Sequence, residues 1–136
     1  MIEVSELEMR ILSELEEAGR ENIPTIINTV MEVSGEDTER SEIQEALLNL
    51  VGADLIRVTL DTRMGEHVEG LSKEGSLTVI KSIGDHLQFK STEGHWTGGV
   101  RPWPEIASTE AGREKAFEIL DERGYQWWRH PPDLND

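Results

Sequence analysis

Residues 41–60, SEIQEALLNLVGADLIRVTL, carry a helix pattern and then a strand pattern in immediate succession. In the first half, apolar residues recur three and four positions apart, which places them on one face of a helix. They are Ile43, Ala46, Leu47, Leu50 and Val51. In the second half, Ile56, Val58 and Leu60 alternate with polar residues, as in a strand that is buried on one face. The stretch therefore predicts a helix and a strand that share one core.

The expected boundaries of this helix come from its polar residues and its glycine. Ser41 and Gln44 have the spacing of a capping box, in which each side chain bonds to a backbone amide at the helix start. This spacing predicts that the helix begins at about Ser41. Gly52 is the expected end, because glycine readily adopts the left-handed backbone that follows a helix.

Two more helices are expected before this stretch. Ser5 and Glu8 form a second capping box, and apolar residues follow at helical spacing up to Gly19. The glutamates of this first helix, at positions 6, 8, 14, 16 and 17, are interpreted as a solvated face. Pro24 suits the first turn of a second helix. The expected apolar stripe of this second helix is Ile26, Ile27, Val30 and Met31. The segment ENIPT is expected to add a short strand, and residues 34–40 a turn.

Residues 61–103 are less regular and hold 7 of the 12 glycines. Residues 72–83 predict a short helix. The run HLQFKSTEGHWTGG predicts a hairpin, with Leu87 and Phe89 on one strand, a turn at residues 92–94 and Trp96 on the returning strand. Residues 61–103 are thus either a long wing or an insertion.

The pattern is clear again toward the C-terminus. Thr109 is a good N-cap and Gly124 a natural stop, which predicts a last helix over about residues 110–123. The residues expected on its buried side are Ala116, Phe117, Ile119 and Leu120.

These elements resemble a known family. The helix, glycine turn and strand of residues 41–60 resemble the recognition helix and first wing strand of winged helix-turn-helix domains. Residues 105–120, EIASTEAGREKAFEIL, resemble the strand, threonine cap and glycine-arginine pair that close the wing in MarR-like and PadR-like transcriptional regulators. The resemblance implies one α+β, mainly helical domain over residues 1–136. It divides into residues 1–60 with three helices and the first wing strand, residues 61–103 with an extended wing or insertion, and residues 104–136 with the last strand, the C-terminal helix and an aromatic tail.

The chain is strongly acidic, with 28 Asp and Glu against 13 Lys and Arg and a net charge of −15. Residues 1–60 alone hold 14 of the acidic residues and 4 of the basic ones. Because DNA affinity rests largely on basic side chains that displace counterions from phosphates, this balance weighs against tight DNA binding. The chain has no cysteine, which excludes disulfides and thiolate chemistry and favours a reducing, cytoplasmic location. No apolar run approaches the length of a membrane span.

The leading functional hypothesis is a winged-helix regulator that binds duplex DNA, weakly or only at a specific operator. Its predicted base-reading residues on the recognition helix are Arg40, Ser41, Gln44 and Asn49, and its predicted phosphate contacts are Arg63 and Lys90. The basic residues of the wing could equally be scattered surface charges. Glu42 and Glu45 on the same helix oppose the phosphates. The alternative is an acidic module for protein interaction or a nucleic-acid mimic, in which Leu48 and the acidic face contact a partner. Leu48 could also simply pack beneath the insertion.

Tyr125, Trp127 and Trp128 follow the last helix. The resemblance implies a homodimer built through residues 110–128, because terminal helices form the dimer in MarR-like and PadR-like proteins. Large aromatic residues are enriched at such interfaces. The alternative is that the two indoles close the core of a single subunit.

No pattern indicates an enzyme, a cofactor or a metal site. His67, His86 and His95 are 19 and 9 residues apart, unlike the close ligand spacing of strong metal signatures. The chain also lacks a G-x-S-x-G nucleophile elbow and a glycine-rich phosphate loop before a helix.

Overall fold

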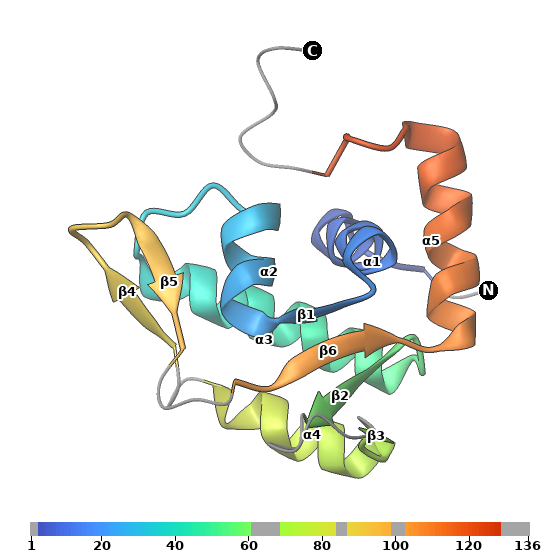
Figure 1. The fold of residues 1–136 in the computed structure, drawn as a ribbon, viewed down its shortest axis with the longest axis horizontal. Coiled ribbons are helices and arrows are strands. Elements are labelled where there is room, and N and C mark those ends of the chain that lie inside the picture. Colours follow the sequence, from blue (N-terminus) through green and yellow to red (C-terminus); the bar gives the residue numbers. More distant parts are fainter. Residues whose placement is uncertain (1–2, 61–68, 84–86, 99–102, 129–136) are drawn as a thin grey trace.

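The computed structural model describes residues 3–60, 69–83, 87–98 and 103–128, and over these ranges the chain is an α+β fold in which helices predominate (Figure 1). The elements in chain order are α1 (Glu6–Ala18), β1 (Arg20–Asn22), α2 (Ile23–Val30), α3 (Asp37–Gly52), β2 (Ile56–Leu60), β3 (Glu69–Gly70), α4 (Lys73–Lys81), β4 (Gln88–Lys90), β5 (His95–Thr97), β6 (Glu105–Ser108) and α5 (Glu110–Arg123).

The main sheet is antiparallel, with strand order β1-β6-β2-β3. Its central strand β6 pairs with β1 on one side and with β2 on the other, so that Ile106 lies opposite both Glu21 and Val58. The hairpin β4–β5 forms a separate sheet and lies beside α2, away from α5 (Figure 1). The described part of residues 61–103 therefore forms β3, α4 and a separate hairpin, not one long continuous wing.

The local signals at the ends of most helices are confirmed. The Ser5 hydroxyl accepts the Glu8 amide and the Glu8 carboxylate accepts the Ser5 amide, each at 3.2 Å. The helix ends at Gly19, whose φ is 81°. Helix α2 has Pro24 in its first turn, and helix α4 has the N-cap Ser72. These caps act within one turn of the chain, which is why sequence spacing predicts them.

Helix α3 begins at Asp37, so the predicted start at Ser41 is wrong. Ser41 is an exposed residue within the helix and caps nothing. The earlier start is stabilised by Glu39, whose carboxylate accepts the Ser34 amide and hydroxyl at 2.7 Å and the Gly35 amide at 2.9 Å. The acidic side chains of the first turn are also favourable beside the positive end of the helix dipole.

The end of α3 also differs in detail from the prediction. Gly52 belongs to the helix, and the left-handed residue is Asp54, with φ 63°. Its carboxylate lies 2.7 Å from the Arg57 guanidinium and 3.7 Å from the Lys73 amine. Aspartate tolerates this backbone better than most residues do, so no glycine is needed at the turn.

The core lies between the helices and the main sheet and includes all five apolar residues predicted for α3. The expectations about the burial of Phe117 and Thr59 are wrong, as is the expectation that Glu8 and Glu14 of α1 lie on a solvated face. Phe117 is 49% exposed, because α5 turns Ala116, Ile119 and Leu120 toward the core instead. Thr59, expected on the polar side of β2, is buried next to β6, where its hydroxyl donates to the Glu105 carbonyl oxygen at 3.3 Å.

Helix α5 is anchored to the turn that follows α3. The Thr109 amide donates to the Leu55 carbonyl oxygen at 2.9 Å, and its hydroxyl donates to the Asp54 carbonyl oxygen at 2.6 Å. The same hydroxyl accepts the Gly112 amide at 3.1 Å and so caps α5. A Cβ atom on Gly112 would overlap the Leu55 carbonyl oxygen. The threonine and glycine therefore set the closest approach between α5 and residues 54–55.

Candidate interaction surface on helix α3

Two side chains predicted to read bases are held by neighbouring helices. The Gln44 amide donates to the carbonyl oxygens of Ile80 and Lys81 at the end of α4, at 3.0 and 3.1 Å. The Asn49 amide donates to the Glu8 carboxylate of α1 at 3.1 Å. Helix α3 thus lies between α4 and α1, and its outward face is narrower than the sequence alone suggests.

The other predicted DNA contacts are not gathered into one basic surface. Arg40 is ion-paired with Asp37 at 3.2 Å. The side chains of Ser41 and Lys90 are exposed and form no hydrogen bond or ion pair to any residue that the structure describes. Arg63 lies outside the described residues. Leu48 is half-buried and packs against the hydrophobic core.

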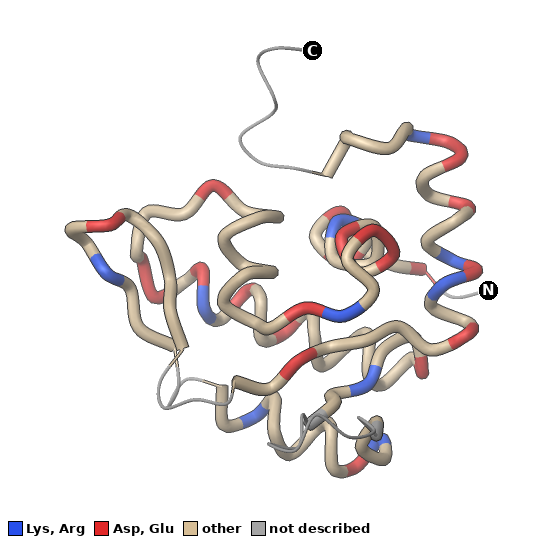
Figure 2. Tube along the Cα trace, viewed as in Figure 1, with Lys and Arg blue, Asp and Glu red and all other residues tan. Residues whose placement is uncertain are grey.

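The outward face that remains on α3 is anionic. Glu42 and Glu45 are exposed, and neither forms an ion pair within the described ranges of the chain. Together with Ala46 and Asn49 they form one wall of a groove, and residues 5–8 at the start of α1 form the other. Acidic residues, red in Figure 2, also lie along α1 and α5. The groove therefore presents carboxylates where a DNA-reading helix would present cations.

The carboxylates beside this groove differ in how far they are neutralised. Arg123 donates to both Glu6 oxygens, at 2.6 and 2.9 Å, and this hydrogen bonding holds the pKa of Glu6 below its usual value. Glu8 is buried and accepts from Ser5 and Asn49. Glu42 and Glu45 have no such donors among the residues described, so they leave the stronger uncompensated negative charge.

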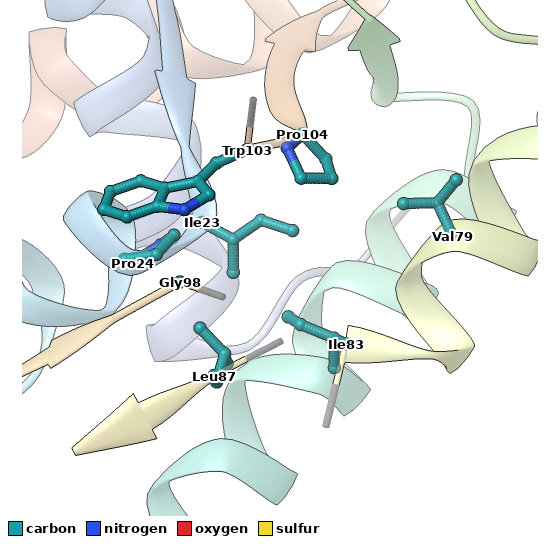
Figure 3. Close-up of a pocket in the computed structure, with 8 residues that line it drawn as sticks. All are labelled: Ile23, Pro24, Val79, Ile83, Leu87, Gly98, Trp103 and Pro104. Carbon is teal, nitrogen blue, oxygen red and sulfur yellow. The ribbon is translucent and has the colours of Figure 1, made fainter. Parts of the chain in front are cut away.

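An apolar cavity lies between the start of α2, the end of α4 and the base of the hairpin (Figure 3). Its lining residues are Ile23, Pro24, Val79, Ile83, Leu87, Gly98, Trp103 and Pro104. The cavity volume is about 20 Å³, which leaves room for about one water molecule. Ligand pockets are larger and contain polar groups that orient the ligand. The cavity is therefore a gap in packing.

The histidines do not form part of a metal-binding cluster in the part of the chain that the structure describes. No group of three potential metal ligands occurs among the described residues. His95 lies 3.5 Å from the Glu93 carboxylate, whereas His67 and His86 fall outside the described residues.

The aromatic residues after α5 pack against α1. Trp128 is 1% exposed, and its indole donates to the Glu14 carboxylate at 3.0 Å. Trp127 is half-buried, and its indole donates to the Ser13 hydroxyl at 3.1 Å. Trp128 thus lies in the core of the subunit, which is the alternative that the sequence left open, while Tyr125 is 63% exposed. The homodimer stays a prediction.

Sequence reasoning missed the polar side of α1 that receives this tail. Ser13 and Glu14 are buried, although Glu14 was expected on a solvated face. Their partners are 114 residues away in the chain, and no local spacing signals such a contact. The Arg10 guanidinium also donates to the Trp128 carbonyl oxygen at 2.8 Å.

The chain was compared with protein-family models, with characterised proteins and with solved structures, and no match was found in any of the three. Among the helices of the described ranges, none is long and apolar enough to cross a membrane.

Proposed function

We propose that this protein is an acidic winged-helix interaction module that binds a basic protein surface through the outward face of α3. One observation carries the proposal. Glu42 and Glu45 stand unpaired on that face among the described residues, while Gln44 and Asn49 are hydrogen-bonded to α4 and α1. Two of the four predicted base readers are therefore occupied and a third, Arg40, is paired with Asp37, while the exposed carboxylates repel phosphates.

Electrostatics favours a basic protein over duplex DNA at this surface. DNA binding gains free energy when Lys and Arg release counterions from phosphates, and carboxylates on the contact face oppose that gain. Against a basic surface the same carboxylates are complementary, which speeds association and disfavours anionic partners. The net charge of −15 acts in the same direction over longer distances.

Support for the winged-helix part of the proposal comes from the order of the elements. Helix α1 and strand β1 are followed by α2, α3 and β2, and β6 returns beside β2 before α5. This order agrees with the resemblance of residues 41–60 and 105–120 to winged-helix proteins. Fold alone does not assign a ligand, so the α3 surface carries the functional part.

The test replaces the two unpaired carboxylates and keeps the fold. The α3 variant is Glu42→Gln/Glu45→Gln. The α5 control variant, Glu114→Gln/Asp121→Asn, removes the same charge from exposed positions outside the groove. The probe is a fluorescently labelled 20-residue peptide rich in Lys and Arg, titrated by anisotropy at low salt.

The α3 variant should bind the peptide about fivefold more weakly, since two surface charge contacts of about 0.5 kcal/mol each are lost. The α5 control variant should change affinity by less than twofold. Equal weakening of both variants would show that only net charge matters. Tighter binding of the wild type to mixed-sequence duplex DNA than to the peptide would favour the regulator hypothesis instead.

A further inference from the structure

The groove beside α3 is one end of a longer trough. A second hollow, at the start of α1, shares Ser5, Glu8 and Asn49 with it. A third hollow, between α1 and α5, shares Glu3 and Val4 with the second. The three hollows therefore adjoin one another in a row from α3, across the start of α1, to the surface of α5.

Carboxylates line both ends of this trough. Glu42 and Glu45 lie at the α3 end, and Glu118 and Glu122 at the α5 end. Among the lining residues that the structure describes, Lys115 is the one cation, and its amine is 3.5 Å from the Glu118 carboxylate. Carboxylates thus outnumber cations among these lining residues, which favours a cationic occupant.

The trough also has an apolar component. Val4 and Leu7 are half-buried, and Ala46 and Ile119 are nearly covered by the rest of the chain but still line the hollows. A purely polar cation would leave these groups in contact with water. An occupant with an apolar side would bury them and gain hydrophobic free energy in addition to charge pairing.

The walls of the trough determine the backbone form of the occupant. They come from α1, α3, α5, the residues that lead into α1, and Ala53 just after α3, so no sheet edge of the described residues lines it. Strand addition needs unpaired main-chain groups at such an edge, whereas an amphipathic helix binds through its side chains. Of these two modes, helix-in-groove binding is the one that fits the walls of the trough.

We propose that the trough binds a cationic amphipathic helix of a partner protein, with its apolar side on Val4 and Leu7 and its Lys and Arg side chains toward the carboxylates. This inference rests on the proposed function and extends it by naming the form of the partner and the second end of the site. A second copy of this chain is a poor occupant, because both copies carry a net charge of −15.

The experiment uses the whole chain and two 18-residue peptides of equal positive charge. One carries Leu and Lys at helical spacing, and the other carries Gln in place of every Leu. Anisotropy titrations should show that the Leu peptide binds at least tenfold more tightly, and circular dichroism should show that it gains helix on binding. Equal affinities, or no gain of helix, would overturn the inference.

A second pair of proteins separates the two proposals. Glu118→Gln/Glu122→Gln should weaken binding of the Leu peptide severalfold, whereas the α5 control variant, which changes the side of α5 outside the trough, should not. If the α3 variant weakens binding and Glu118→Gln/Glu122→Gln does not, the extended trough is refuted and the proposed function stands. If the α3 variant also binds as the wild type does, the proposed function fails with it.

Discussion

Gly112→Ala is expected to destabilise the protein, although alanine is normally the better residue in a helix. Gly112 lies in the first turn of α5, directly against the Leu55 carbonyl oxygen. An added Cβ would overlap that oxygen, so α5 must move away from residues 54–55. The movement would strain or break the two hydrogen bonds that Thr109 donates to the carbonyl oxygens of Asp54 and Leu55.

The size of the effect follows from three contributions. Losing two hydrogen bonds removes about 0.5–1.5 kcal/mol each. Overpacking at a tight contact adds about 1–3 kcal/mol, and the better helix propensity of alanine returns about 1 kcal/mol. The net loss in the free energy of unfolding is about 1–5 kcal/mol, with a central value of about 3 kcal/mol. For a chain of this size that central value lowers Tm by roughly 10 °C.

Gly52→Ala is the matched control, since Gly52 is also helical and nothing lies within 4 Å of the position its Cβ would take. It should leave stability unchanged or raise it by up to about 1 kcal/mol. Both variants are measured by urea denaturation and by thermal unfolding. A Gly112→Ala protein as stable as the wild type, next to an unaffected Gly52→Ala protein, would refute the packing argument.

Three further predictions concern buried or partly buried carboxylates. Burial opposes ionisation of Glu39, but its hydrogen-bond donors, which include the Trp96 indole, outweigh burial and lower its pKa. The stability that Glu39 contributes above its unfolded pKa should therefore be lost as pH falls through its lowered folded pKa. Urea denaturation should show that Glu39→Gln destabilises the protein at pH 7 and does so much less in acid. Burial, followed by the charge of Glu14, raises the pKa of Glu21. Ionisation of Glu21 should thus reduce stability as pH rises through its raised folded pKa. Thermal unfolding should show that Glu21→Gln raises Tm at pH 8 and has little effect at pH 4. The same change in Tm at both pH values would count against a raised pKa of Glu21. Trp128→Phe removes the indole donor from the buried Glu14 carboxylate and should lower the free energy of unfolding by about 2–3 kcal/mol in urea, at every protein concentration if Trp128 belongs to the core of one subunit.

Much of the secondary structure could be predicted because its signals are local. Ser5 and Thr109 cap their helices through groups three residues away, and Gly19 and Gly124 end them with positive φ. The start of α3 could not be predicted in the same way. Ser41 and Gln44 have capping-box spacing, which indicated a start at Ser41. However, the Glu39 carboxylate binds the preceding loop and the hairpin, and this longer-range contact extends the helix toward the N-terminus.

The candidate site was predictable in its charge and not in its geometry. The sequence already placed Glu42 and Glu45 on the outward side of α3 beside Gln44 and Asn49. It could not show that those two amides bond to α4 and α1, because these partners lie 36 and 41 residues away in the chain. The trough, with walls from three helices, has no sequence signature for the same reason.

The amino-acid sequence by itself determined most of the apolar faces, the caps at Ser5 and Thr109, the hairpin and the acidic balance, because periodicity, capping and charge depend on neighbouring residues. The tertiary structure alone decided which side chains are buried, which are hydrogen-bonded and which remain exposed. It buried Glu14 beneath Trp128, held Gln44 against α4 and left Phe117 in solvent. Burial and hydrogen bonding between distant residues depend on how the helices pack, and that packing is settled only when the whole core forms.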